Sequence, residues 1–278
     1  MALSNFHRKP LNIAHRGARS LAPENTLAAA RKALEVGADM WELDVGISAD
    51  GELVVIHDLT LERTSDVKRV YADRKPWRVC DFSLRELKSL DFGSWFVRED
   101  PFGQIAVGNL AEKEYGKYMG EPILTLQEAL EFTLQHRWQV NVEIKDLTGT
   151  QGDFNVVEQT IHLIEDLGAE AYVILSSFNP AYLKRASKAN PNIPTALLTD
   201  FPQMNLIALL GELKAQGYHP RIDDMQSVDV RFLQLQGYDV RVWVVNDEET
   251  MNAMIERGVN AIFTDFPQLL KAALDELP

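Results

Sequence analysis

Short apolar runs alternate with helical stretches along most of the chain, and this alternation limits the fold more than any other feature. Eight strands are expected, and helix-period stretches stand at residues 24–36, 126–135, 156–167, 181–189, 204–216, 247–256 and 267–277. Such alternation is typical of a parallel sheet covered by helices. The expected strands are residues 11–14, 40–47, 139–145, 172–176, 195–198, 218–222, 240–245 and 261–264.

Eight strand–helix units in about 250 residues favour a (β/α)8 TIM barrel. An open doubly wound sheet is the alternative, but no glycine-rich dinucleotide turn follows the first predicted strand. A chain of 278 residues with 46% hydrophobic content suits one large domain with a sizeable core. We therefore predict a single barrel domain over residues 1–278.

One connection is much longer than the others. About 65 residues separate Asp58 from Ile123, whereas a βα connection usually has about 2–6 residues. Asp50-Gly51 predicts a hairpin turn just upstream, and residues 84–90 read as a short helix. We predict an insertion after the second strand, at about residues 59–122, beside the carboxyl ends of the strands, where substrate-selecting loops belong.

Two predicted strands carry ionisable residues on one face. Glu42 and Asp44 alternate with apolar residues, as do Glu143 and Lys145, so each pair points to one side of its strand. Both faces of a parallel sheet are normally covered, and buried charges are costly unless they are paired or hold a metal. This conflict between pattern and fold indicates a functional site.

The three carboxylates Glu42, Asp44 and Glu143, with no cysteine among them, predict a hard oxygen site for a divalent cation. Such a site suits Mg²⁺ or Ca²⁺, with Mn²⁺ also possible. An internal salt-bridge network with Arg16 and Lys145 is the alternative. It would leave one negative charge uncompensated, because three carboxylates would face two cations.

Further polar residues stand at the ends of predicted strands, where barrel enzymes carry their catalytic groups. His15 and His57 are candidates for general acid and general base. Arg16 and Lys145 are candidates for holding an anionic group, and Trp243 offers a flat apolar wall, in the pocket rather than in the core. A metal with two histidines and two cations suits hydrolysis or transfer at a phosphate ester.

Several short motifs of this chain resemble those of the glycerophosphodiester phosphodiesterase family, in the same order from near residue 11 to the C-terminus. The motifs are His15-Arg16-Gly17, Pro23-Glu24-Asn25-Thr26, Glu42-Leu43-Asp44-Val45, His57-Asp58-Leu59-Thr60-Leu61-Glu62-Arg63-Thr64, Glu143-Ile144-Lys145 and Thr264-Asp265-Phe266-Pro267. Each motif alone is weak, but together they are specific. The resemblance implies a metal-dependent (β/α)8 barrel that splits glycerophosphodiesters into glycerol 3-phosphate and an alcohol.

The resemblance also implies roles for individual positions. The family's acid–base histidines, metal carboxylates and phosphate contacts correspond to His15 and His57, to Glu42, Asp44 and Glu143, and to Arg16 and Lys145. Residues 90–96 are similar to the family's insertion, which helps to hold the glycerol end. Two departures are a missing glycine turn at residues 65–70 and Val244, where the family usually has threonine after the tryptophan.

Two rival functions fit the same motifs. One is a lysophospholipid head-group hydrolase of the same fold, which a longer apolar groove from the insertion would favour. The other is a module that binds glycerophosphodiesters without turning them over, although a binder needs no acid–base pair. The sequence leaves open the head group, the ion, the nucleophile (water or the glycerol 2-hydroxyl), the acid and base roles of the histidines, and the oligomeric state.

Composition excludes some partners. The net charge of −13, from 41 acidic and 28 basic residues, argues against nucleic acid and against stable association with an anionic membrane. It does not argue against a small-molecule phosphodiester substrate, because a cation in a cleft reverses the local field.

Residues 1–10 do not resemble a secretory signal and no apolar run is long enough to span a bilayer, so we expect a cytoplasmic protein. The single cysteine, Cys80, is expected to be a structural thiol in a reducing compartment.

Other residues near the motifs have simpler interpretations. Asp58 either orients His57 or belongs to a turn. Asn25 is expected to start the first helix rather than to touch substrate, and Asp265 is expected to hold the eighth βα turn. Surface or packing roles are expected for His7, His136, His162 and His219, and packing roles are expected for Trp41, Trp77 and Trp138.

Overall fold

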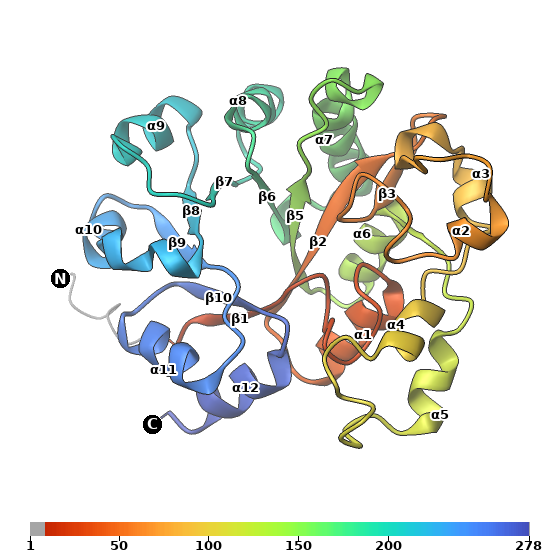
Figure 1. The fold of residues 1–278 in the computed structure, drawn as a ribbon. Helices are drawn as coiled ribbons and strands as arrows, with labels where there is room; N and C mark the ends of the chain where they lie inside the picture. The colour runs from red at the N-terminus through yellow and green to blue at the C-terminus, as the bar shows by residue number, and fades with distance from the viewer. Residues whose placement is uncertain (1–8, 278) are drawn as a thin grey trace.

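A computed structural model of the chain describes residues 9–277, and eight of its strands form a closed parallel barrel (Figure 1). The hydrogen-bonded order is β1-β10-β9-β8-β7-β6-β5-β2, and pairing of β1 with β2 closes the ring. The predicted (β/α)8 TIM barrel is confirmed. Its strands are β1 (Leu11–Ala14), β2 (Met40–Ile47), β5 (Gln139–Ile144), β6 (Val173–Ser177), β7 (Thr195–Thr199), β8 (Gly217–Pro220), β9 (Asp239–Val242) and β10 (Ala261–Thr264).

Helices follow the barrel strands and surround them on the outside (Figure 1). Their amphipathic stretches bury one face, and side chains cap most of their first turns; Thr125, for example, forms a capping box with Glu128 at the start of α6. The helices that cover the barrel are α1 (Leu27–Glu35), α6 (Leu126–Gln135), α7 (Val156–Leu167), α8 (Pro180–Ala189), α9 (Leu206–Leu213), α10 (Val230–Leu235), α11 (Glu248–Glu256) and α12 (Pro267–Asp275).

The helices α1 and α10 are among those that differ from the expectation. The sequence pattern places the start of the first helix at residue 24, but the helix begins at Leu27 because Asn25 is left-handed, with φ of 58°, and Thr26 caps the helix. Asn25 therefore does not start the helix, and that interpretation is wrong. The short helix α10 is absent from the prediction, because its six residues bury only Val230 and Leu233 and give little periodicity.

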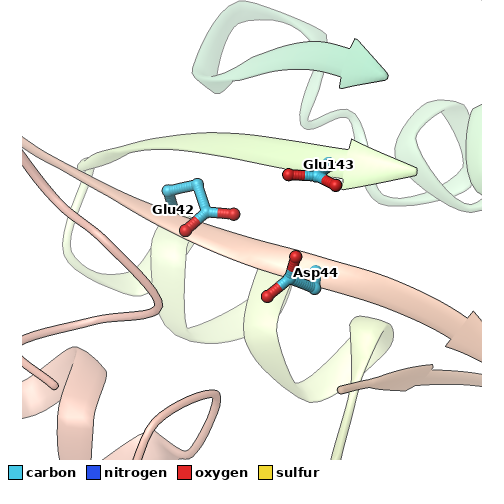
Figure 2. Close-up of side chains that lie close together, drawn as sticks. All are labelled: Glu42, Asp44 and Glu143. Carbon is cyan, nitrogen blue, oxygen red and sulfur yellow. The ribbon is translucent and has the colours of Figure 1, made fainter. Parts of the chain in front are cut away.

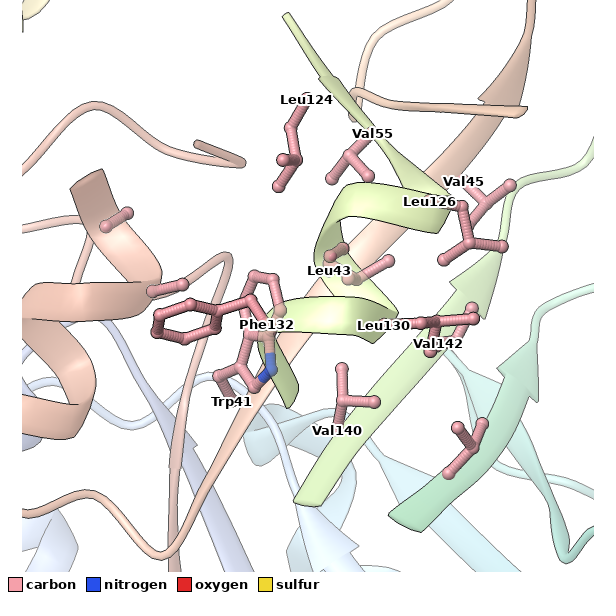
Figure 3. Close-up of a cluster of buried hydrophobic side chains, with 14 of the residues drawn as sticks. Trp41, Leu43, Val45, Val55, Leu124, Leu126, Leu130, Phe132, Val140 and Val142 are labelled. Carbon is pink, nitrogen blue, oxygen red and sulfur yellow. The ribbon is translucent and has the colours of Figure 1, made fainter. Parts of the chain in front are cut away.

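Apolar side chains fill the space between the barrel and its helices. On β2 and β5, Leu43, Val140 and Val142 are fully buried against α6, which contributes Leu126 and Leu130 (Figure 3). Full burial of one such side chain stabilises the fold by roughly 1.5–3 kcal/mol. The outward residues of these strands therefore pack against the helices. The alternate residues point into the barrel, where they can form the site.

The side chains inside the barrel change from apolar to charged along the barrel axis. A layer of Ile13, Met40, Ala261 and Phe263 closes the amino-terminal part of the barrel. Two residues further along β2 from Met40, the inward position is occupied by Glu42. The apolar layer therefore forms a floor beneath the charged side chains that point into the barrel.

The segment between β2 and α6 extends the sheet and then packs against the loop after β1. β3 (Leu53–Val55) pairs antiparallel with β2, as the hairpin prediction required, and β4 (Leu124–Thr125) pairs with β3. Tyr118 donates a hydrogen bond to the Leu21 carbonyl in the loop after β1. Between β3 and β4 lie α2 (Val67–Val70), α3 (Leu84–Leu87), α4 (Ser94–Glu99) and α5 (Glu112–Tyr115).

Two sequence expectations concern the amino terminus and membrane-spanning segments. The expectation for residues 1–10 falls almost entirely outside the described residues, as does His7. Within residues 9–277, no helix has the length and apolar character needed to cross a membrane.

Candidate active site

Three buried carboxylates lie together on two neighbouring strands. Glu42 and Asp44 point inward from β2, and Glu143 lies on β5 in register with Asp44 (Figure 2). One oxygen from each lies within 4.8 Å of the other two. All three residues are buried, with exposed fractions of 2%, 1% and 8%. The strand pairing brings together the three carboxylates that the sequence singled out.

The electrostatics of this cluster fit a bound cation. Burial and the charges of Asp44 and Glu143 raise the pKa of Glu42 well above its ordinary value, and burial also raises the pKa of Glu143. The Oε1 atom of Glu42 is buried and has no hydrogen-bond partner among residues 9–277. A divalent cation fits this set, because it is all oxygen and carries an unsatisfied buried acceptor.

Two cations border the carboxylates. Lys145 Nζ lies 2.6 Å from Glu143 Oε1 and 3.4 Å from Asp44 Oδ1, and Arg16 Nε lies 3.4 Å from Asp44 Oδ2. Burial alone would raise the pKa of Asp44, but Lys145 and Arg16 lower it overall. Part of the alternative arrangement, an internal salt-bridge network, is therefore observed: Lys145 forms ion pairs with Asp44 and Glu143, and Arg16 with Asp44. Among residues 9–277 this network leaves out the side chain of Glu42, whose Oε2 accepts from the Arg16 backbone N–H at 2.7 Å.

His15 follows β1 and is held by a carboxylate on the neighbouring strand's loop. Its Nδ1 lies 2.7 Å from Asp265 Oδ1, and Asn246 donates to the other oxygen of Asp265 at 2.8 Å. Burial and the adjacent Arg16 lower the pKa of His15, although the contact with Asp265 opposes this shift. The sequence predicts only that Asp265 holds the last βα turn, and its contact with His15 goes beyond that prediction.

His57 follows β3 and has a similar partner. The Ile56 backbone N–H donates to the Asp44 carbonyl at 2.9 Å, which places the next residue beside the carboxylate cluster. His57 Nδ1 lies 2.7 Å from Asp58 Oδ1. The structure thus favours the first of the two interpretations of Asp58, the one in which it orients His57. Neither His15 nor His57 has a hydrogen-bond partner at Nε2 within the described part of the chain.

Comparison with known proteins shows the family to which the chain belongs. A profile of the glycerophosphoryl diester phosphodiesterase family matches residues 15–269. The chain belongs to this family. As a family member, it is a phosphoric diester hydrolase.

Individual relatives agree with the family assignment. The chain is 35% identical to a glycerophosphodiester phosphodiesterase of Caldanaerobacter subterraneus subsp. tengcongensis, over 94% of this chain and 96% of the relative. It is similar in structure to an Oleispira antarctica phosphodiesterase solved with the product sn-glycerol-3-phosphate, with a TM-score of 0.78 and 30% identity over 96% of this chain and 98% of the other. A Silicibacter pomeroyi structure, with a TM-score of 0.81 and 23% identity over 98% and 95% of the two chains, supports the fold.

Trp243 lies at the mouth of this phosphodiesterase barrel, just after β9. The side chain is half-buried, packs partly on the apolar floor and meets Phe178 edge-on with the ring centroids 5.4 Å apart. Its indole N–H donates to the His219 carbonyl at 2.8 Å. Trp243 therefore packs against other residues and also has an exposed part. Its expected role as a wall of the substrate pocket stays a prediction.

Sequence reasoning missed several residues that support the site. Asn25 donates to Asp44 Oδ2 at 2.8 Å and accepts from the Asp44 backbone N–H, so it fixes this carboxylate. Glu24, Arg19 and Arg63 form ion pairs in the loops above the barrel. The only signal for them is their place within or beside the family motifs, because contacts between loop residues leave no periodicity in the sequence.

An apolar groove opens beside His57 and Lys145 in this phosphodiesterase. It has a volume of about 400 Å³ and lies between the insertion and the loop after β5. Leu59, one of its walls, is 52% exposed. Its other apolar walls include Ile47, Ile56, Val79 and Leu147.

The remaining histidines and tryptophans behave as expected where they are described. His136 and His162 are exposed, and His219 is fully buried in the barrel. The tryptophans expected to pack in the core are buried: Trp41, Trp77 and Trp138.

Proposed function

We propose that this protein is a metal-dependent phosphodiesterase that hydrolyses glycerophosphodiesters to glycerol 3-phosphate and an alcohol by two-histidine acid–base catalysis. The observation that carries the proposal is the convergence of two carboxylate-bound histidines on three buried carboxylates. The Oleispira antarctica phosphodiesterase was solved in complex with its product sn-glycerol-3-phosphate, which supports the same product here.

Each residue has a defined task in this scheme. Glu42, Asp44 and Glu143 would hold the divalent cation, Mg²⁺ or Ca²⁺. When bound, this ion supplies positive charge that polarises the phosphate and lowers the pKa of the attacking oxygen.

The two histidines would move the protons. A carboxylate that accepts from Nδ1–H leaves Nε2 of the ring to exchange a proton with the substrate. One of His15 and His57 would take the proton of the nucleophile, and the other would protonate the leaving oxygen. Arg16 and Lys145 would offset charge on the phosphoryl oxygens as it redistributes.

Phosphorus NMR of glycerophosphocholine incubated with the protein tests this proposal. We expect glycerol 3-phosphate as the phosphorus-containing product, together with free choline. Phosphocholine as the product would place the cleavage on the other side of the phosphate and contradict the proposal.

The apolar groove favours a second candidate, hydrolysis of lysophospholipid head groups. A lysolipid carries an acyl chain that an apolar groove of about 400 Å³ could partly bury. The comparison is kcat/KM for a short-chain lysophosphatidylcholine against that for glycerophosphocholine. A preference for the lysolipid that Leu59→Asp removes, and that the remote exposed control Leu235→Asp keeps, would establish this candidate.

A further inference from the structure

One buried carboxylate in the loop before α1 joins three arginines. Glu24 is only 2% exposed at its side chain. Arg63 binds it with two hydrogen bonds of 2.7 and 3.0 Å, Arg16 Nη1 donates to it at 2.8 Å, and Arg19 lies 3.2 Å away. A two-pronged arginine contact of this kind fixes orientation as well as charge. Glu24 is therefore the common partner of three side chains.

Two chains of polar contacts start at Glu24, and the first path leads to His57. Arg63 uses its Nε and Nη2 atoms to bind Asp58, at 2.7 and 3.1 Å. Asp58 in turn binds His57 Nδ1. A single guanidinium thus spans Glu24 and the carboxylate that holds this histidine.

The second path leads to His15. Arg19 Nη1 lies 3.6 Å from Asp265 Oδ1, the same oxygen that contacts His15 Nδ1. Its other terminal nitrogen pairs with Glu24. The two histidines come from different loops, and Glu24 is the point where the paths to them meet.

Two aromatic residues of the insertion lie beside the connecting arginines, of which Arg63 itself belongs to the insertion. The guanidinium of Arg63 lies 5.9 Å from the Trp95 ring, and that of Arg19 lies 5.2 Å from the Phe102 ring. Cation–π contacts of this kind favour the observed orientation of the two arginines. The mouth of the barrel and the insertion are thus joined through one ionic cluster.

We propose that Glu24 is a positioning residue that holds both histidine–aspartate pairs in place, through Arg63 on one side and Arg19 on the other. This role rests on the proposed two-histidine function. A glutamine at position 24 would keep the shape, but it would offer one acceptor oxygen instead of two and turn an N–H donor towards an arginine. Both histidines should then lose their fixed orientation together.

Proton NMR of the histidine Nδ1–H signals tests this proposal without metal, substrate or turnover. In Glu24→Gln we expect the signals of both His15 and His57 to shift or broaden. Arg63→Lys should affect only the His57 signal, and Arg19→Lys only the His15 signal. If Glu24→Gln leaves either signal unchanged, or if each lysine variant affects both signals or neither, the proposal is overturned.

Controls separate positioning from loss of folding. Arg19 and Arg63 are 19% and 37% exposed at their side chains, so the two lysine variants carry the test even if Glu24→Gln does not fold. Glu158→Gln removes a remote ion pair with Arg185 and should leave both signals unchanged. In the active enzyme, Glu24→Gln should lower kcat about tenfold or more, and Glu24→Asp should recover part of that loss. Full activity in Glu24→Gln would contradict the proposal.

Discussion

At the scale of single residues, the described histidines fall into groups with different surroundings. His15 and His57 each have Nδ1 fixed by an aspartate at 2.7 Å beside the carboxylate cluster. His219 is buried in the barrel, and neither ring nitrogen has a partner among residues 9–277. The first arrangement suits proton transfer, whereas the second suits a permanently neutral ring.

Removing either candidate catalytic histidine should stop most turnover. His15→Ala and His57→Ala should each lower kcat by about 10²-fold or more, because each removes one proton-transfer group. Steady-state release of glycerol 3-phosphate measures the loss. The exposed His162→Ala is the matched control and should retain full activity. Near-normal turnover in either variant at the site would exclude the two-histidine scheme.

The carboxylate cluster should bind its cation in competition with protons. Burial raises the pKa of Glu42 and of Glu143, and a protonated carboxyl group cannot hold a cation. Metal affinity should therefore fall as the pH is lowered towards these raised pKa values, and binding should release protons. Calorimetric titration with Mn²⁺ in buffers of different ionisation enthalpy detects that release.

One substitution tests the ligand role of Glu143 directly. Glu143→Gln should weaken the affinity for Mn²⁺ about tenfold or more, because it removes a charged oxygen ligand. Glu212→Gln, at an exposed ion pair with Lys184, is the control. An unchanged titration for Glu143→Gln would exclude it as a ligand.

At the scale of elements, the turn between β1 and α1 carries His15, Arg16 and Glu24 and depends on Gly17. This glycine has φ of 77°, and an added Cβ would lie 2.6 Å from the Ala29 backbone carbon and Cβ. A left-handed conformation costs a non-glycine residue roughly 1–3 kcal/mol, and here a clash adds to that cost.

Gly17→Ala should therefore destabilise the protein by at least about 2 kcal/mol and lower its activity, as measured by urea unfolding and product release. Gly168→Ala is the matched control, because Gly168 is also left-handed but has no atom within 4 Å of an added Cβ. Equal losses of stability in the two variants would mean that the clash with Ala29 contributes nothing.

Strands β2 and β5 also show which part of the site can be predicted from the sequence. Period-two alternation on β2 and β5 was sufficient to predict that Glu42, Asp44 and Glu143 share one side of the sheet, because strand geometry is local. The contacts of Asp265 with His15 and of Asn25 with Asp44 join residues 250 and 19 positions apart. No periodicity encodes such contacts, so they required the closed barrel.

At the scale of the whole molecule, the buried His219 should make folding sensitive to acid. Burial and Arg241 lower its pKa well below 6.5 in the folded protein. Below about pH 6.5 the unfolded chain binds a proton there and the folded chain does not, so stability falls as the pH falls. The contribution is at most about 1.4 kcal/mol per pH unit.

Urea unfolding of the protein and of His219→Leu between pH 7.5 and 5 measures this contribution. The free energy of unfolding should fall more steeply with acid in the unmodified protein than in the variant. All other titrating groups are common to both, so the difference in slope isolates His219. Identical slopes would mean that His219 binds its proton over the same pH range in the folded and the unfolded chain, and would contradict the prediction.

At this scale the proposed enzyme is one metal-dependent hydrolase, built from the barrel, the three carboxylates and the two histidines. Its most direct test is release of glycerol 3-phosphate from glycerophosphocholine by EDTA-treated protein, before and after addition of Mg²⁺, Ca²⁺ or Mn²⁺. We predict no release after EDTA treatment and recovery with at least one of these ions. Undiminished release after complete removal of metal, or no release with any of the three ions from a folded protein, would contradict the account.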